Sequence, residues 1–532
     1  MTEPAGVWDV ILVGAGTAGC VLANRLSADP ALSVLLIEAG EEPGDPRIDD
    51  PAAWPLLQNT PVDWAFRTVP QPHMAGRVED CPRGRVIGGS SAIHAMGHMR
   101  GHPGDFAAWV AAGAEGWGHD DLLPYFIRSE TSPFAGEPGY GTDGPLHLQQ
   151  PPAPHPLSRA HVEAGVALGL PRLRDHNGGP MAGATFNTMT IDGGRRQSAA
   201  AAYLTDAVRA RPNLHIRKGA LVDRLILDDD DRATGIVLAQ GERRETLRAR
   251  AAVILAAGSI GSPAILMRSG FGPGAMLKQA GVAVRRDVPE LGRNLQDHLL
   301  SGGNLYRSRQ PVPPTGTQHS EAMMYIPAEG ADPEAPPDLV VGVTSVPLVS
   351  AALAGEVPVP EMGEGFTLMF GITHPRSRGH LALRSADPAD PPLIDPAYLS
   401  HPQDRAHFVE AMGWARRLAA CPSYDPWRGE ELLPRPADLA SDAATERFIA
   451  RAATTHHHPV GTLRMGRDAA APVTPGLALR GAERLFVVDG SVMPSLTTGP
   501  VNAAIVAIAE RAADMIAAEL ALDAPGRAAP AA

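Results

Sequence analysis

The chain has 532 residues, of which 44% are hydrophobic and 20% charged, and its formal net charge is −13 at pH 7. This length is too great for a single hydrophobic core, so at least two domains are expected. The negative charge disfavours nucleic acid and anionic membranes as main partners, and no apolar stretch of the sequence approaches the length of a membrane span. The three cysteines are too scattered for a disulfide or metal pattern. With no signal peptide evident after Met1, they predict a cytoplasmic protein.

The first element expected is a buried parallel strand, because residues 8–13 form a short run of branched apolar side chains. GAGTAG follows and fits the G-x-G-x-x-G turn that joins a strand to a helix in dinucleotide-binding folds. The first glycine allows the tight turn, the second lets the backbone approach a pyrophosphate, and the third lets helix and strand pack closely. The helix N-terminus then offers free N–H groups to the phosphates. The residues predicted to contact the pyrophosphate are Gly14, Gly16, Thr17, Ala18 and Gly19.

A second strand, residues 33–37, ends at Glu38, about twenty residues past the glycines. A carboxylate there accepts hydrogen bonds from a ribose diol, and Ala39 beside it is expected to line the same position. The acid disfavours a ribose 2′-phosphate, so NAD or FAD is expected rather than NADP. The alternative interpretation is a glycine turn that binds no ligand, but the strand, helix, second strand and acid all occur in the required order.

GGSS at residues 88–91, flanked by Arg83 and Arg85, is either a simple turn or a second backbone concavity for an anion. Two such loops favour FAD, which needs a long extended site.

The rest of the chain predicts a second domain inserted into the first. A hairpin is expected around the acidic run 228–231, and residues 249–272 again give a strand, a glycine turn and a helix. Proline-rich loops then separate alternating strands, which predicts an antiparallel sheet. The fold class is α/β (α+β overall), a Rossmann-like FAD-binding domain with a discontinuous antiparallel-sheet substrate domain. The expected boundaries are 1–150, 195–298 and 455–532 for the FAD-binding domain, and 151–194 and 299–454 for the substrate-binding domain.

The last part contains TTHHHPVGTLRMG, a strand at 484–490 and a helix from Val501 with apolar residues at helical spacing. Pro500 is expected in the first turn of that helix, where no N–H is needed. The helix N-terminus would favour negative charge beside it.

With these pieces placed, the sequence strongly resembles the glucose–methanol–choline (GMC) family of FAD-dependent alcohol oxidoreductases over nearly its whole length. The resemblance is carried by the opening GAGTAG, by RGRVIGGSSAIHAM, by GSIGSPAILMRSGFG, and by HHHPVGTLRMG with VVDGSVMP and NAAIVAIAERAADMI. It implies that Gly14, Gly16, Gly19 and Glu38 hold the ADP half of FAD, that Arg85, Gly88, Gly89 and Ser90 lie along the flavin, that Val222 lies near the adenine, that Asp489 and Gly490 lie near the pyrophosphate and ribityl chain, and that Pro500 and Val501 lie beside the flavin.

Two positions depart from the family pattern. Many members carry Asn where this chain has His94, so the contact near the reactive edge of the flavin differs. Some members attach FAD covalently to a histidine at the position of Ile93, so dissociable FAD is expected here.

Alcohol oxidation needs a base for the hydroxyl proton, and a histidine suits that task because its pKa lies near neutrality. The resemblance places His458 at the catalytic position. If residues 456–458 run extended, His456 shares its face and positions substrate, whereas His457 faces away. Asn502 matches the second catalytic position, where its amide donates to the alkoxide, although capping the terminal helix is an alternative. His298 is expected to be a structural turn contact, and the histidine run is not expected to bind metal.

The resulting prediction is an FAD oxidase of primary alcohols on aromatic rings that uses O2, since several stretches are most similar to a branch of the family that oxidises pyridoxine. The alternatives are an FAD dehydrogenase that passes electrons to a quinone or another acceptor, and a hydroxynitrile lyase, which shares the fold. The expected partners are a small alcohol and O2, and the expected state is a monomer or small homo-oligomer.

Overall fold

The first apolar run forms β1 (Val7–Val13), which lies inside a seven-stranded sheet of the computed structural model. The structure describes residues 6–241 and 243–522. β1 pairs in parallel with β2 (Val34–Ile37) and β13 (Arg243–Leu255), and β2 pairs in parallel with β10 (Leu214–Arg217). β2 is buried along its whole length, as expected for a parallel strand covered on both faces. The two strands predicted on either side of GAGTAG are therefore confirmed.

β13 serves two parts of this sheet. Its first half pairs antiparallel with β12 (Ala233–Gln240), which pairs antiparallel with β11 (Leu221–Leu227). Its second half lies between β1 and β24 (Leu485–Val487), both parallel to it. The predicted hairpin around the acidic run and the return of the chain to the first sheet are both confirmed.

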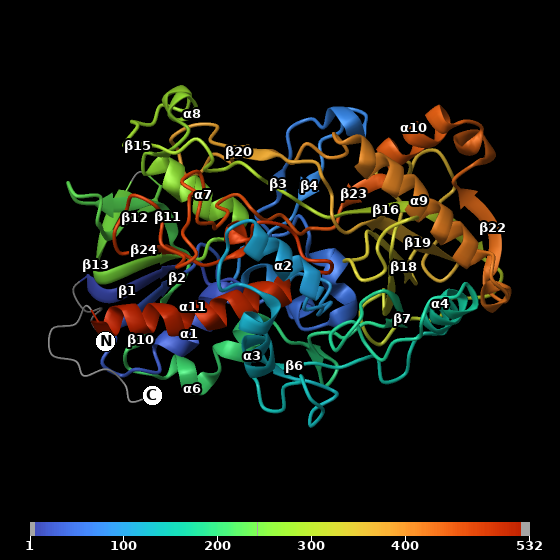
Figure 1. Ribbon diagram of the computed structural model, residues 1–532, viewed down its shortest axis with the longest axis horizontal. Helices are drawn as coiled ribbons and strands as arrows, with labels where there is room; N and C mark the ends of the chain where they lie inside the picture. The colour runs from blue at the N-terminus through green and yellow to red at the C-terminus, as the bar shows by residue number, and fades with distance from the viewer. Residues whose placement is uncertain (1–5, 242, 523–532) are drawn as a thin grey trace.

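Two helices lie side by side beneath this sheet, α1 (Thr17–Leu26) and the longer α11 (Asn502–Leu522), and α3 (His119–Ser129) packs against α11 (Figure 1). The prediction that Pro500 lies in the first turn of the terminal helix is wrong. The Val501 carbonyl accepts the Ile505 N–H at 3.0 Å, so Val501 is the N-cap and Pro500 lies outside the helix.

Glu510 is fully buried on α11, although the sequence pattern places it on the polar side of the helix. Its carboxylate accepts two hydrogen bonds from Arg25, at 2.8 and 2.9 Å, and one from the Tyr203 hydroxyl at 2.8 Å. Arg128 forms a further ion pair with it at 2.8 Å. The charge is buried because three other elements supply its partners.

We expect Glu510→Ala to lower the free energy of unfolding by about 3 kcal/mol, because it leaves two arginines and a tyrosine hydroxyl without their shared acceptor. Urea denaturation of the variant and the parent protein measures the loss. Asp514→Ala is the matched control on the same helix: its ion pair with Arg128 is half exposed, so a loss below about 1 kcal/mol is expected. Equal losses in the two variants would contradict the role given to Glu510.

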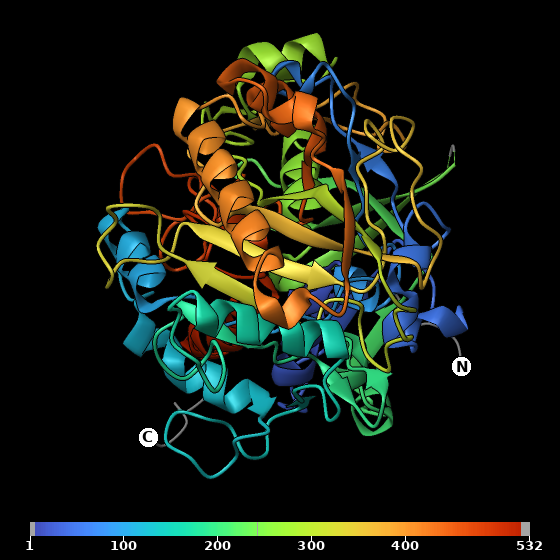
Figure 2. The same cartoon turned by 90° about the vertical axis from the view of Figure 1, so that its right-hand side faces the viewer.

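The second sheet is antiparallel, which confirms the sheet predicted for this part of the chain. β16 (Leu299–Ser308) lies inside it, between β19 (Gly365–Ile372) on one side and β22 (Arg428–Leu433) with β23 (Ala453–Thr455) on the other. α9 (Pro402–Ala419) and α4 (Pro156–Ala167) pack on one face of it (Figure 2). In spatial order the strands are β17 (Ala322–Ile326), β18 (Leu339–Thr344), β19, β16 and β22, and β23 also pairs with β16.

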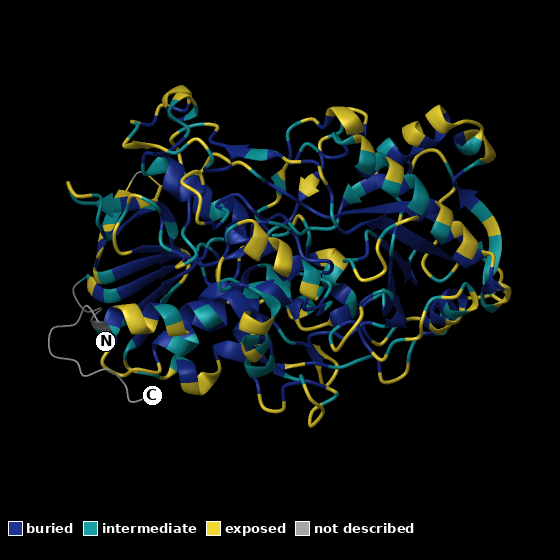
Figure 3. Ribbon diagram, viewed as in Figure 1, coloured by how far each residue is buried: buried dark blue, intermediate teal, exposed yellow. Residues whose placement is uncertain are grey.

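The two sheets occupy opposite ends of the molecule, and both are buried while exposed residues gather on the outer helices and loops (Figure 3). The domain boundaries given above stay a prediction. Among the described residues, no helix combines the length and apolar character that crossing a bilayer requires.

The remaining helices are α2 (Pro103–Ala111), α5 (Ala199–Tyr203), α6 (Asp206–Arg209), α7 (Gly258–Arg268), α8 (Gly274–Gln279) and α10 (Asp442–Ala452). The remaining strands are short and are β3 (Phe66–Arg67), β4 (Asp80–Cys81), β5 (Glu130–Thr131), β6 (Leu146–His147), β7 (Gly183–Phe186), β8 (Ile191–Asp192), β9 (Arg195–Arg196), β14 (Phe271–Gly272), β15 (Arg286–Asp287), β20 (His380–Ala382) and β21 (Leu393–Asp395).

Candidate active site

The glycine turn after β1 leaves no room for side chains at two of its positions. Gly14 has φ +102°, and a Cβ there would lie 2.6 Å from the Ala256 carbonyl oxygen. A Cβ at Gly19 would lie 1.8 Å from the Gly14 carbonyl oxygen. These contacts account for the tight turn and for the close packing of α1 on the strand.

The two predicted anion-binding loops meet each other. The Gly88 N–H donates to the Ala15 carbonyl at 2.7 Å, and a Cβ at Gly89, which has φ +54°, would lie 2.6 Å from the Gly16 Cα. A Cβ at Gly16, by contrast, would come no nearer than 3.9 Å to its neighbours. The protein itself therefore does not require glycine at position 16, whereas it does at position 89.

The start of α1 suits a phosphate. Gly16 is the N-cap and, having no side chain, does not cap the first N–H groups. The first turn, which includes the buried Thr17 and Ala18, contains no acidic residue. At the end of β2, the buried Glu38 carboxylate accepts the Ala15 N–H at 2.9 Å and the Gly40 N–H at 2.8 Å. An uncapped helix start beside a fixed carboxylate fits the pyrophosphate and ribose of FAD.

The other residues predicted to contact FAD lie on several elements. Asp489 is held within the protein, where it accepts the Gly258 N–H at 2.9 Å and the Ser262 hydroxyl at 2.6 Å. Arg85 is exposed, with its guanidinium 5.0 Å from the Trp64 ring centroid. The positions of the rest are Ala39 after β2, Ser90 in the 3-10 turn Gly89–Ala92, Val222 on β11, Gly490 after Asp489, and Pro500 with Val501 before α11. Their contacts with the cofactor stay predictions.

His94 presents a hydrogen-bond donor that the described residues leave unpaired. Its Nδ1 accepts the Met96 N–H at 3.1 Å and lies 3.1 Å from the Arg196 guanidinium. Because Nδ1 is an acceptor, Nε2 carries the proton, and this buried nitrogen has no partner within 6–241 and 243–522. A donor in this position fits an acceptor on the flavin, as an Asn amide would. The neighbouring Ile93 offers only carbon atoms, so it forms no covalent link.

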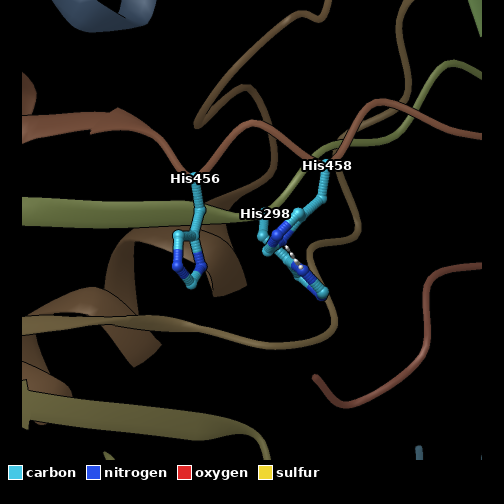
Figure 4. A group of neighbouring side chains, drawn as sticks. All are labelled: His298, His456 and His458. Atoms are coloured by element: carbon cyan, nitrogen blue, oxygen red, sulfur yellow. Dashed lines mark hydrogen bonds between the residues drawn. The ribbon is translucent and has the colours of Figure 1, made fainter. Parts of the chain in front are cut away.

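Three histidines from two distant segments lie together: His298, His456 and His458 (Figure 4). His298 Nδ1 lies 2.9 Å from His458 Nδ1, and the two ring planes are 87° apart. The centroid of the His456 ring lies 4.4 Å from that of His458. His456 and His458 lie together as expected, although the run between them is not extended, and the cluster also includes His298.

Strand pairing brings these side chains together. β23 pairs antiparallel with the start of β16, and the pairing continues beyond both strands. The His456 N–H donates to the His298 carbonyl at 2.8 Å, and Gln296 and Val460 exchange two backbone hydrogen bonds at 2.9 and 3.1 Å. Residues 296–301 and 453–460 are thereby fixed as neighbours.

His457 lies outside the cluster for a reason that differs from the expected one. The run is not uniformly extended, because His457 has φ +68°, in the left-handed region. Its N–H donates to the Thr455 hydroxyl at 2.8 Å, and its carbonyl accepts from Arg83. The turn at His457 is therefore held by hydrogen bonds on both sides.

The histidines are neutral near pH 7. Burial is the main cause that lowers the pKa of both His298 and His456 to about 3, and that lowers the pKa of His458 well below its usual 6.5. The neighbouring imidazoles lower these pKa values further, because two positive charges would repel each other. His458 can therefore accept a proton without first losing one.

Asp297 holds the backbone of His458 through a hydrogen bond. Its Oδ1 accepts the His458 N–H at 2.6 Å, and its Oδ2 accepts the Tyr398 hydroxyl at 2.5 Å and the Thr455 hydroxyl at 2.6 Å. Burial raises the pKa of Asp297, and these hydrogen bonds oppose the rise. No sequence motif predicted Asp297 or Tyr398 as site residues. His298 was predicted as a structural turn contact, and its hydrogen bonds to His458 and Thr373 do not decide between a structural and a functional role. The only local signal was the adjacent acid–histidine pair at 297–298.

Asn502 does not join this cluster by any hydrogen bond of the described residues. Its Oδ1 accepts the Thr17 hydroxyl at 2.7 Å, which links the starts of α11 and α1. The two N–H groups of the Asn502 amide remain available to donate hydrogen bonds. Its role toward the alkoxide stays a prediction.

By distance alone, the three histidines could hold a metal ion, since their ligand atoms lie within 4.8 Å of one another. The expectation that no metal binds here concerns residues 456–458 alone and does not include a third imidazole from His298. The prediction that the run binds no metal stays a prediction.

Comparisons with known proteins agree with this fold. Models of the N- and C-terminal parts of the GMC oxidoreductases match residues 8–300 and 375–509. The chain therefore belongs to the GMC oxidoreductase family, and it is an FAD-dependent alcohol oxidoreductase with the Rossmann-like FAD-binding domain of that family.

Within the family, the chain is 47% identical to pyridoxine 4-oxidase from Microbacterium luteolum, over 94% of this chain and 98% of the relative. It is 36% identical to the oxygen-dependent choline dehydrogenase of Brucella anthropi, over 96% and 95% of the two chains. The solved structure of pyridoxine 4-oxidase from Mesorbium loti has a TM-score of 0.91 at 48% identity, and the match covers 95% of this chain and 98% of that one.

Proposed function

We propose that this protein is an FAD-dependent oxidase of primary alcohols on aromatic rings, with pyridoxine as the substrate and pyridoxal and hydrogen peroxide as the products. The observation that carries the proposal is the neutral His458, paired with His298 at 2.9 Å and set beside His456. The choice of pyridoxine is supported by the likeness to two pyridoxine 4-oxidases over nearly the full length of the chain.

In this mechanism, His458 is the base that takes the hydroxyl proton of the alcohol. FAD, when bound, supplies the acceptor for the hydride that leaves the alcohol carbon. His456 orients the substrate from the same side of the cluster. Asn502 keeps only its amide N–H groups for the developing alkoxide, because Thr17 occupies its oxygen.

An apolar wall beside the cluster supports an aromatic substrate. Its members on β16 to β19 lie on the face of the second sheet opposite α9, since they alternate along the strands with the residues that pack against α9. Met99 and Met181 come from loops and join the same apolar wall. Leu300, two residues after His298, belongs to it. Methionine sulfur and aromatic rings attract each other, so this wall suits a pyridine or benzene ring. Its residues are Met99, Met181, Leu300, Met323, Tyr325, Val340 and Met369.

The proposal predicts that pyridoxine bleaches the enzyme-bound flavin without oxygen, and that air then yields one hydrogen peroxide per aldehyde. The measurement is a panel of pyridoxine, hydroxymethylfurfural, benzyl alcohol and choline, scored by flavin absorbance and by peroxide release. Pyridoxine is expected to give the highest kcat/KM and choline the lowest, because choline has no ring for the apolar wall. Preference for choline would overturn the substrate assignment.

A dehydrogenase is the second candidate, because relatives at 36–37% identity are an oxygen-dependent choline dehydrogenase and an alcohol dehydrogenase that uses an acceptor. It would bleach the flavin but form little peroxide, and would turn over with an added quinone. A hydroxynitrile lyase would leave the flavin oxidised, so anaerobic bleaching excludes it.

We also propose that FAD is bound without a covalent link, since Ile93 replaces the histidine of some members. Acid precipitation is expected to release the flavin into the supernatant. We place the enzyme in the cytoplasm, which agrees with three cysteines that are free and buried, Cys20, Cys81 and Cys421. A monomer or small homo-oligomer is expected.

A further inference from the structure

We propose that His298 is a positioning residue that holds His458 in the tautomer whose Nε2 carries no proton. This nitrogen is then the one that accepts the hydroxyl proton of the alcohol. The inference rests on the proposed role of His458 as the base. It adds how the chain selects, before substrate arrives, the one ring nitrogen that can do this work.

The selection begins at the backbone of Thr373. His298 Nε2 lies 2.7 Å from the Thr373 carbonyl oxygen. A carbonyl oxygen only accepts hydrogen bonds, so His298 Nε2 must carry the hydrogen and donate. This oxygen belongs to the main chain just after β19, so it cannot rotate away as a side chain could.

The second step follows from the charge of His298. Its side chain is buried, and burial is the main cause that lowers its pKa to about 3, with His456 adding to the effect. A neutral imidazole carries one N–H only. Because that N–H is used at Nε2, His298 Nδ1 has a free lone pair and must act as an acceptor.

The third step transfers this constraint to His458. The partner of His298 Nδ1 is His458 Nδ1, at 2.9 Å. Two nitrogens without hydrogens would repel each other at this distance, so His458 Nδ1 carries the hydrogen and donates it. His458 is also neutral, so its Nε2 has a free lone pair. His298 Nδ1, a fixed acceptor for His458 Nδ1, thus makes His458 Nε2 the nitrogen that can accept a proton.

The backbone around His458 holds the ring in place for this contact. Asp297 accepts the His458 N–H at 2.6 Å, and the adjacent His298 accepts from the ring. One dipeptide therefore fixes both the main chain and the tautomer of the base. During the reaction the hydroxyl proton moves to His458 Nε2, and the ring becomes an imidazolium that still donates from Nδ1.

The test uses the FAD-loaded full chain in its oxidised state. Histidine side chains are labelled with 15N, and the His458 signals are assigned as those missing from His458→Ala. We expect a protonated Nδ1 and an unprotonated Nε2 at pH 7. A protonated Nε2 in the parent protein would overturn the proposal without any variant, so the result does not depend on whether a substitution folds.

Two substitutions of His298 provide the functional test. His298→Leu keeps the volume but removes the acceptor, so flavin reduction by pyridoxine is expected to slow by about 10-fold or more with little change in KM. His298→Asn places an amide oxygen near the position of Nδ1 and is expected to recover most of the rate. If His298→Asn reduces flavin no faster than His298→Leu, an acceptor at this position has no effect, and the positioning role is refuted.

Two results separate this proposal from the proposed function. If His458→Ala itself reduces flavin at the parent rate, the base assignment fails, and the role of His298 fails with it. If His458→Ala is slow but His298→Leu keeps the parent rate and NMR signals, only the positioning role fails. A metal bound stoichiometrically to the purified enzyme would also overturn it, because both Nδ1 atoms would then be ligands.

Discussion

His458→Ala is expected to slow flavin reduction by a factor of about 10² or more, the usual scale for losing a general base. Anaerobic stopped-flow mixing of the oxidised enzyme with saturating pyridoxine measures this step directly. The reason is that the substitution removes the ring whose Nε2 accepts the hydroxyl proton. The rings of His298 and His456 remain, but their centroids lie 5.1 and 4.4 Å from the place of the missing one. Reduction at nearly the parent rate would refute the assignment.

The matched control is His457→Ala, one residue away and outside the cluster. Its rate is expected to stay within about 3-fold of the parent, because general-base effects require direct contact with the substrate. The pH dependence gives a second check. A base works when unprotonated, and burial lowers the pKa of His458 well below 6.5. The rate of reduction should therefore stay on its plateau as the pH falls through 6.5, and decrease only at lower pH.

Gly16→Ala is expected to weaken FAD binding by about 10- to 100-fold, which corresponds to about 1–3 kcal/mol for forcing a methyl group into a filled site. In the protein alone that methyl group has room, since its nearest neighbour would be the Gly89 Cα at 3.9 Å. Gly16 also has φ −78°, which alanine adopts readily. The apo protein should therefore fold normally and lose only its affinity, measured by titrating apo protein with FAD.

Two other glycines provide the controls for Gly16. Gly19→Ala places a Cβ 1.8 Å from the Gly14 carbonyl oxygen, so the fold itself should fail and little soluble protein is expected. Gly413→Ala adds an exposed methyl group on α9 that would have no neighbour within 4 Å among the described residues, so both affinity and stability should be kept. If Gly16→Ala binds FAD like Gly413→Ala, the pyrophosphate does not lie against Gly16.

The FAD-binding elements could be predicted from the sequence because their signals are local. β1, the glycine turn and the start of α1 lie within a short stretch, and Glu38 follows at the spacing that one strand–helix–strand unit imposes. The hairpin of β11 and β12 is equally local. In each case the backbone geometry depends on residues close in the sequence. The periodicity of apolar residues and the positions of glycines are therefore enough to predict these elements.

The burial of Glu510 and the exact start of α11 could not be predicted from the sequence. Glu510 occupies a polar position in the helical pattern, but arginines and a tyrosine from other elements surround it. Pro500 is compatible with a first helical turn, yet the hydrogen bond between Val501 and Ile505 begins the helix later. Both outcomes depend on packing partners that the pattern of one helix does not contain.

The dinucleotide-binding unit follows from contiguous residues, and the resemblance to the family adds the histidine proposed as the base. The contact between His298 and His458, which are 160 residues apart, follows only from the folded arrangement of the chain. That contact requires residues 296–301 to pair with residues 453–460 across the second sheet. Such pairing is chosen by the packing of the whole sheet, and no local periodicity encodes which distant strand becomes the neighbour.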